Sequence, residues 1–189
     1  SLLKSIGLSV IMAQSGMYVP CENYVFSPYD KLMVRIGNND NLFESHSSFI
    51  CEIREANNIV NQANGKSLVL ADEFCASTER DSATQIVSSM LQWLSNNNSS
   101  FIFATHLFEL LETTESLQAQ NLRIAHLKVI IDKEGLLFDR KLTDGCPTER
   151  NYGTMVAQKI FKNTKFKLML NRKILNKKSR KINKSRYSN

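Results

Sequence analysis

The sequence predicts an α/β fold: a mainly parallel sheet flanked by helices. Two apolar runs carry the prediction, residues 67–71 (SLVLA) and residues 101–105 (FIFAT), and a helical pattern separates them. Strands buried on both faces have such continuous apolar runs, and a helical crossover joins neighbouring strands that run parallel. With 189 residues, 42% of them hydrophobic, the chain is long enough for one sizeable domain with its own core.

The elements before the first apolar run are less regular. Residues 2–15 have a helical apolar face that ends at Gly16, and two strand-like pieces are expected around Pro20 and Pro28. The next helical pattern spans residues 45–64. These features place at least one further strand and two helices before residue 67.

The start of the second helix is marked by two serines. Ser47 and Ser48 suit helix N-caps, and Glu52, four residues after Ser48, approximates the acidic partner of a capping box. We therefore expect the Glu52 carboxylate to reach back toward the start of its own helix.

In the second half of the chain, the residue pattern predicts a third helix, a hairpin and a last helix. The third helix spans residues 80–94, and a short helix follows the second apolar strand at residues 107–112. Residues 122–142 alternate as a hairpin that turns near residues 133–135. The last helix covers about residues 151–162.

Charge is divided unevenly along the chain. Residues 1–149 hold 11 basic and 18 acidic residues, a net charge of −7, whereas residues 150–189 hold 13 basic residues and no acid. We expect one domain over residues 1–162, which includes the last predicted helix, followed by a basic tail over residues 163–189. The tail is interpreted either as a linker to a further domain, which we favour slightly, or as a contact with the DNA backbone.

The cysteines and the hydropathy indicate an intracellular protein without a membrane span. The four cysteines are widely spaced and form no C-x-x-C pair, which favours reduced thiols over a disulfide framework or a metal site; they are Cys21, Cys51, Cys75 and Cys146. No apolar stretch approaches the roughly 20 residues that a membrane helix needs. The chain begins with Ser1, which indicates a fragment of a longer chain or a processed one.

Polar residues follow both buried strands where they end. The first run stops on Asp72 and Glu73, two carboxylates that repel each other and resist dehydration, and the second ends on Thr105 and His106. Ligands bind at the carboxyl ends of parallel strands, so these groups indicate a site. An apolar strand that ends in Asp-Glu is the pattern of a Walker B motif, in which the Asp holds Mg²⁺ and the Glu orients or deprotonates water.

Five segments together resemble the ATPase domain of the MutS family of DNA mismatch repair proteins. They are SLLKSIGLSVIMAQSGMYVP, VRIGNNDNLFESHSSFICEI, SLVLADE, FIFATHLFEL and NYGTMVAQ, in the order and spacing of the family. The resemblance covers roughly residues 1–162, and the A-T-H-x-F-E-L segment is its most specific part. It implies a P-loop NTPase fold of the kind found in ABC-type ATPases.

The resemblance also implies roles for individual residues. Asp72 would bind Mg²⁺, Glu73 would be the catalytic base, and His106 would contact the γ-phosphate or position the attacking water. Ser47 and Ser48 match signature serines at a helix start that faces the ATP of a partner subunit, as the dipole of a helix N-terminus favours phosphate. Thr78 matches the one position retained in the loop after Walker B and is assigned to the nucleotide site.

Arg35 and Asp40 also match family positions, and we expect them to line this region.

The chain departs from the family pattern in that loop. The family reads D-E-(I/L)-G-R-G-T, whereas this chain has Cys75 and Ala76 in place of the first Gly and the Arg, and Ser77 in place of the second Gly. Ser45 and His46 also stand where Gly and Arg are common. Loss of glycine reduces the backbone freedom of the loop, so efficient hydrolysis is in question.

No G-x-x-x-x-G-K-(S/T) motif is present, and in a gapless match Ser1 falls just after it. We therefore expect these 189 residues by themselves to bind ATP poorly and not to turn it over.

The expected function is thus ATP binding and hydrolysis in a MutS-like repair protein, coupled through a homodimer or heterodimer to the binding of mismatched DNA. The alternative is a dimerisation or scaffold module that keeps the fold without turnover. A third class, an ATP-binding-cassette protein for chromosome or transport work, is disfavoured because no L-S-G-G-Q-type signature is present.

Overall fold

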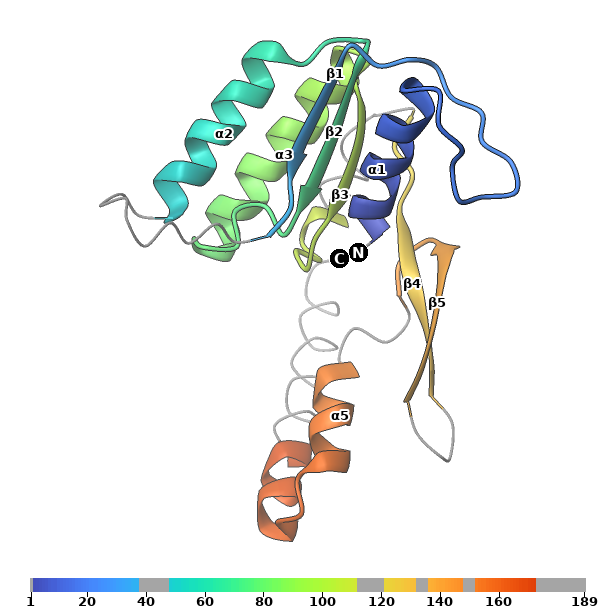
Figure 1. Cartoon of the computed structure of the whole chain (residues 1–189). Coiled ribbons are helices and arrows are strands. Elements are labelled where there is room, and N and C mark those ends of the chain that lie inside the picture. Colours follow the sequence, from blue (N-terminus) through green and yellow to red (C-terminus); the bar gives the residue numbers. More distant parts are fainter. Residues whose placement is uncertain (1, 38–47, 112–120, 132–135, 148–151, 173–189) are drawn as a thin grey trace. The chain divides into compact units, whose positions relative to one another are not determined.

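The computed structural model describes most of the chain, namely residues 2–37, 48–111, 121–131, 136–147 and 152–172. The chain forms two compact units, Ser1–Leu122 and Arg123–Asn189 (Figure 1). The expected division between residues 162 and 163, which separates a domain from a basic tail, stays a prediction.

The first unit contains a parallel three-stranded sheet. Its strands are β1 (Lys31–Arg35), β2 (Ser67–Asp72) and β3 (Ser100–Ala104), in the order β1-β2-β3. Both apolar runs of the sequence are strands of this sheet, and they lie next to each other with β2 in the centre. The predicted α/β class and the parallel pairing are therefore confirmed.

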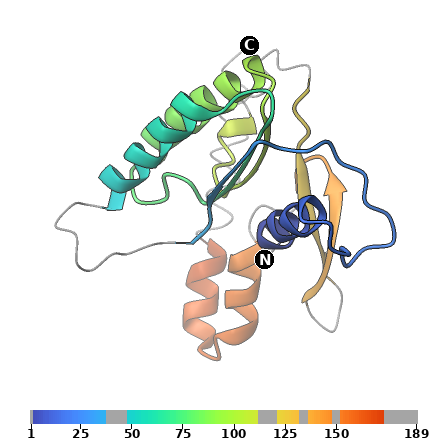
Figure 2. The same ribbon diagram turned by 45° about the horizontal axis from the view of Figure 1, so that its top comes forward.

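Helices cover both faces of the sheet. α1 (Leu2–Gln14) lies on one face, and α2 (Ser48–Gln62) and α3 (Arg80–Asn96) lie side by side on the other (Figures 1 and 2). The three predicted helices are confirmed, with ends that shift by at most a few residues. Because the three strands run parallel, the loops that follow their carboxyl ends lie at one edge of the unit.

The central strand β2 explains the layering. Val69 and Ala71 face the core under α2 and α3, whereas Leu68 and Leu70 face α1, and all four are at most 4% exposed. Alternate side chains of a strand point to opposite faces, so a strand covered on both sides must be apolar throughout. α1 approaches this strand closely, since a Cβ added at Gly7 would lie 3.1 Å from Cδ1 of Leu70.

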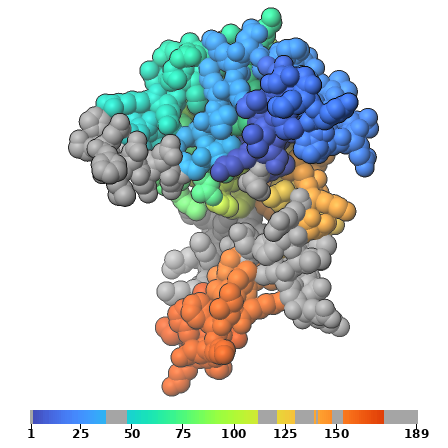
Figure 3. Space-filling view, in the orientation of Figure 1, coloured from blue at the N-terminus to red at the C-terminus, as the bar shows by residue number. Residues whose placement is uncertain are grey.

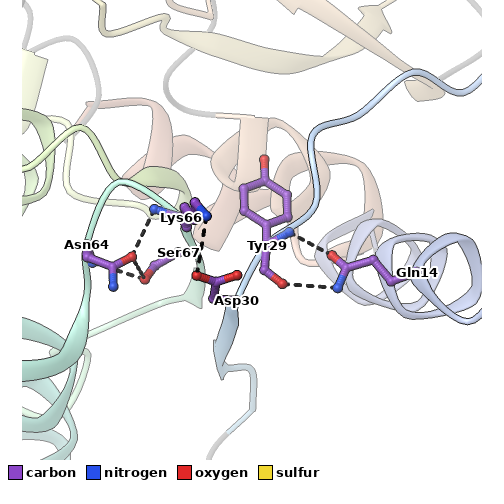
Figure 4. Close-up of polar contacts among 6 residues, drawn as sticks. All are labelled: Gln14, Tyr29, Asp30, Asn64, Lys66 and Ser67. Atoms are coloured by element: carbon purple, nitrogen blue, oxygen red, sulfur yellow. Dashed lines mark hydrogen bonds and ion pairs between the residues drawn. The ribbon is translucent and has the colours of Figure 1, made fainter.

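A side chain of α1 forms hydrogen bonds with the backbone just before strand β1. The Gln14 amide donates to the Tyr29 carbonyl (3.0 Å) and accepts from the Tyr29 amide N–H (2.9 Å), as a neighbouring backbone would (Figure 4). Residues 17–30 contain no strand, so the strand-like piece expected around Pro20 is wrong, whereas the one after Pro28 is β1. The Gln14 side chain thus fixes the end of this loop, next to β1.

The amino-terminal ends of the strands are closed by local polar contacts. Asn64 Oδ1 accepts from the Lys66 amide N–H (2.9 Å) and from the buried Ser67 hydroxyl (3.1 Å), and Lys66 Nζ lies 4.0 Å from Asp30 Oδ2 (Figure 4). The Ser99 hydroxyl donates to the Asn64 carbonyl at 2.9 Å. The buried hydroxyls of Ser67 and Ser99 thus each have a partner, as buried polar atoms must.

The second unit contains a hairpin and helices. β4 (Ala125–Ile131) and β5 (Leu136–Asp144) pair antiparallel, as predicted, and the predicted turn lies outside the described residues. α5 (Tyr152–Ile160) confirms the last predicted helix, and residues 164–172 are also helical. The rings of Phe161 and Phe166 lie 4.6 Å apart between these two helices.

The structure describes the state of the cysteines and the character of the helices. Cys21, Cys51, Cys75 and Cys146 are all free thiols. Within the described ranges, every helix is too short or too polar to cross a bilayer.

Candidate active site

The acidic pair and the histidine meet at the carboxyl edge of the sheet. Asp72 pairs in register with Ala104, and the amide N–H of Glu73 donates to the Ala104 carbonyl at 2.8 Å, which extends the β2–β3 ladder by one residue. The Glu73 carboxylate Oε1 lies 3.0 Å from Nε2 of His106. The side chains of Glu73 and His106 are 54% and 71% exposed, so both can also reach a ligand.

The turn after β3 brings His106 to this place. Thr105 Oγ1 accepts from the Leu107 amide N–H at 3.0 Å, and the His106 carbonyl accepts from Phe108 N–H at 3.1 Å. A hydroxyl bonded to the amide two residues on favours a turn at the end of a strand. The local sequence T-H-L-F therefore stops β3 and turns the imidazole toward the neighbouring strand end.

The backbone after Asp72 is strained. Glu73 has a φ of 50° and Cys75 a φ of 62°, in the left-handed region that side chains with a Cβ rarely adopt. Such residues cost on the order of 1–3 kcal/mol each and persist where surrounding contacts hold them. The loop supplies such contacts, since the Ala76 and Thr78 amides donate to the carbonyls of Glu73 (3.2 Å) and Cys75 (3.4 Å).

The remaining predicted site residues lie in the segments around this edge. Ser48 is the exposed first residue of α2, and Ser47 lies outside the described residues, as does Asp40. The Thr78 hydroxyl donates to Oε2 of Glu79 at 2.8 Å. Hydrogen bonds from Ser82 and then from Thr78 hold the pKa of Glu79 below its usual value. The structure thus brings Glu73 and His106 into contact, whereas it shows Thr78 engaged with its neighbour.

A buried ionic cluster at the same edge was missed by the sequence analysis. Arg35 ends β1, and its guanidinium lies 3.4 Å from Glu52 Oε1 and 2.8 Å from Glu55 Oε2, while it also donates to the Gly37 carbonyl (2.8 Å). The Glu52 side chain is only 3% exposed, and its Oε2 accepts from the Ser77 hydroxyl at 2.8 Å.

The position of Glu52 corrects the expected capping box. Its two carboxylate oxygens bond to Arg35 and Ser77, so the carboxylate points into the unit. A buried carboxylate gains more from a guanidinium and a hydroxyl than from a partly exposed helix end. The available signal was the apolar periodicity of α2, which places Glu52 between Phe49, Ile53 and Ala56, on the buried stripe.

Cys75 lies beside this cluster and is only 1% exposed. Burial, and secondly the charge of Glu52, raise the pKa of its thiol to about 11. At neutral pH Cys75 is therefore a protonated, inert core residue of the loop.

A groove of about 440 Å³ lies along the free edge of the sheet, between β1 and α2. β1 is visible at the surface of the first unit in Figure 3. The polar residues that line the groove are Lys31, Arg35, Glu55, Asn58 and Gln62. The predicted catalytic residues are not among its lining residues, so the groove is distinct from the strand-end site.

The described residues contain no group of three or more His, Cys, Asp or Glu side chains arranged to hold a metal ion. The donor chemistry at the strand ends nevertheless fits Mg²⁺, because this ion is usually bound through one or two carboxylates, with phosphate oxygens and water completing the set. Asp72 provides a partly exposed carboxylate of this type.

The sequence of the chain is similar to those of DNA mismatch repair proteins. The family model described as MutS domain V matches residues 1–174. A DNA mismatch repair mutS homologue of Acanthamoeba polyphaga mimivirus is 40% identical over 87% of this chain. A mitochondrial DNA mismatch repair mutS homologue of Sarcophyton glaucum is 36% identical over 88%, and the DNA mismatch repair protein MutS of Chlorobium chlorochromatii is 35% identical over 84%.

The chain spans 15–18% of the length of these three relatives. The match of the family model to nearly the whole chain, together with the MutS-like segments that form the sheet and its carboxyl edge, shows the family. The chain belongs to the MutS family and corresponds to its domain V.

Proposed function

We propose that the chain is the ATP-binding and ATP-hydrolysing part of a MutS-like DNA mismatch repair protein. The observation that carries the proposal is the contact between Glu73 and His106 at the strand ends, directly after Asp72. A base, an imidazole and a further carboxylate at one open edge of a parallel sheet suit the hydrolysis of a phosphoanhydride. The layered parallel sheet also suits the P-loop NTPase fold.

Each of the three side chains has a distinct task in this mechanism. Asp72 would hold Mg²⁺, which neutralises phosphate charge when bound. Glu73 accepts the proton of the attacking water, for which its carboxylate is accessible. His106 donates a hydrogen bond from its ring to the water or to a phosphate oxygen, and its contact with Glu73 keeps base and donor within reach of the same small ligand.

A second copy or a related subunit would complete the site. Ser48 lies exposed at the start of α2, where the helix dipole favours a phosphate. Together with Ser47, it would face the ATP held by a partner subunit, and Thr78 would line the chain's own nucleotide site. Dimerisation through this edge would couple the nucleotide state to the binding of mismatched DNA by the whole protein.

The alternative is a MutS-like scaffold that dimerises without hydrolysis. The observation that favours it is the backbone of the loop after Asp72. Cys75 has a left-handed φ without the glycine that would adopt it freely. A loop with this reduced backbone freedom suits a subunit that keeps the fold without a catalytic cycle.

The deciding experiment uses the full-length protein with Mg²⁺ and ATP. We expect ATP hydrolysis that responds to mismatched more than to matched duplex DNA, and we expect Glu73→Gln to lower kcat by at least 100-fold while ATP binding is kept. Glu22→Gln, in the loop before β1, is the matched control and should behave as wild type. ATP binding without hydrolysis in wild type and Glu73→Gln alike would support the scaffold instead.

A further inference from the structure

The loop after the acidic pair is attached to α2 by one hydrogen bond between side chains. The Ser77 hydroxyl donates to Oε2 of Glu52 at 2.8 Å, and the other oxygen of Glu52 lies 3.4 Å from the Arg35 guanidinium. We call these three residues the loop clasp. It joins the end of β1, the second turn of α2 and the loop between β2 and α3.

The clasp differs from an ordinary surface contact in its burial. The side chains of Arg35 and Glu52 are 11% and 3% exposed, so the carboxylate has little access to water and depends on its two partners. Hydrogen bonds to a charged group are roughly twice as strong as neutral ones. Ser77, which is itself on the surface, therefore has a strong and specific anchor in the interior.

The anchored loop is the one that sets the position of Glu73. Glu73 and Cys75 have left-handed backbones, and the amides of Ala76 and Thr78 close turns back onto these two residues. A strained turn keeps its shape only when both ends are held. The β2–β3 ladder holds one end through the bond from Glu73 to Ala104, and Ser77 holds the other.

We propose that Ser77 and Glu52, supported by Arg35, are positioning residues for Glu73. The inference rests on the proposed function, because it assigns the clasp to the hydrolytic step. Ser77 stands where the family pattern has its second glycine, which has no hydroxyl, so this contact belongs to the chain's own version of the loop. Glu52 lies one helical turn after Ser48, so the clasp also fixes the start of α2 relative to the catalytic base.

The test uses Ser77 variants of the full-length protein, with two readouts. Ser77→Ala removes only a surface hydroxyl, so the fold is kept. We expect kcat for ATP hydrolysis to fall about three- to tenfold with KM within about twofold of wild type. We also expect amide hydrogen exchange in a peptide over residues 73–79 to accelerate at least about tenfold. Ser77→Thr keeps the hydroxyl and should restore both values.

Two further variants complete the design. Ser89→Ala is the matched control, because its hydroxyl bonds only to the Gln85 carbonyl within α3, and it should retain the wild-type kcat. Glu52→Gln combined with Ser77→Ala should be no slower than Glu52→Gln alone, since the two residues act through one contact.

The two readouts, kcat and amide hydrogen exchange, test the clasp separately from the proposed function. An unchanged kcat in Ser77→Ala, with or without faster exchange, would overturn the positioning role, and unchanged exchange would show that no clasp holds the loop. A wild-type protein that neither binds nor hydrolyses ATP would overturn the proposed function and, with it, the catalytic role of the clasp. The exchange data would then still decide whether the clasp holds the loop.

Discussion

The Glu73 carboxylate lies 3.0 Å from the His106 imidazole, across the carboxyl ends of two neighbouring parallel strands. The two residues are 33 positions apart in the sequence, and they are brought together by the register of β2 and β3, with Asp72 opposite Ala104, and by the turn after β3. Both side chains are more than half exposed, so a ligand can reach them from solvent.

Replacing His106 tests this pair directly. His106→Ala in the full-length protein removes the proposed donor to the water or the phosphate, and we expect kcat for ATP hydrolysis to fall by about 10- to 100-fold. His126→Ala, whose ring bonds to the Gly145 carbonyl in the hairpin, is the matched control and should keep the wild-type rate. Equal rates for all three proteins would remove His106 from the mechanism.

Removal of the Glu52 charge should destabilise the first unit. Glu52→Gln leaves the largely buried Arg35 with only Glu55, and we expect the free energy of unfolding to fall by about 2–4 kcal/mol. Asp30→Asn, which alters an exposed pair at 4.0 Å, should change it by less than about 0.5 kcal/mol. Urea unfolding followed by circular dichroism measures both, and equal effects of the two variants would contradict the burial argument.

The buried thiol of Cys75 predicts a loss of stability at alkaline pH. Its pKa is about 11 in the folded chain, against an ordinary value of 9.0, so between these pH values the unfolded chain loses a proton that the folded chain retains. The thiol therefore lowers stability progressively from about pH 9 to pH 11, by up to about 3 kcal/mol.

The comparison with Cys75→Ala isolates this effect from other titrating groups. The stability difference between wild type and the variant should shift against wild type as the pH rises from 8 to 11. Cys21→Ala, at an exposed position, should show no such shift. A difference that stays constant with pH for Cys75→Ala would mean that its thiol is not desolvated.

The basic tail gives a prediction about DNA. If residues 163–189 contact the DNA backbone, duplex affinity of the full-length protein should fall steeply with added salt, and deletion of the segment should flatten this dependence. Fluorescence anisotropy between about 50 and 200 mM salt measures the slope. An unchanged slope after deletion would leave the tail as a linker.

The sequence alone predicted those strands that depend on a local pattern of apolar residues. Two fully apolar runs predicted β2 and β3, and their polar ends predicted that Glu73 and His106 would share an edge. The strand-like piece predicted around Pro20 is wrong, since residues 17–30 form no strand. The Gln14 side chain binds Tyr29 just before β1, a contact 15 residues away in sequence that no local pattern shows.

The clasp could not be predicted for a similar reason. Glu52 contacts residues 17 and 25 positions away, on two other elements, while its place near a helix start suggested a local capping role. The Glu52 side chain is buried, which favours its long-range contacts over a local capping role. Which charged side chain becomes buried depends on tertiary packing.

In the proposed site, Asp72 holds a divalent metal ion together with ATP beside Glu73 and His106. The most direct measurement is Mn²⁺ electron paramagnetic resonance, with Mn²⁺ replacing Mg²⁺, on the full-length Glu73→Gln protein with ATP. We expect Mn²⁺ to bind only when ATP is present. The further change Asp72→Asn should weaken this Mn²⁺ binding at least about tenfold. Equal Mn²⁺ binding with and without Asp72, in the presence of ATP, would contradict this role of Asp72.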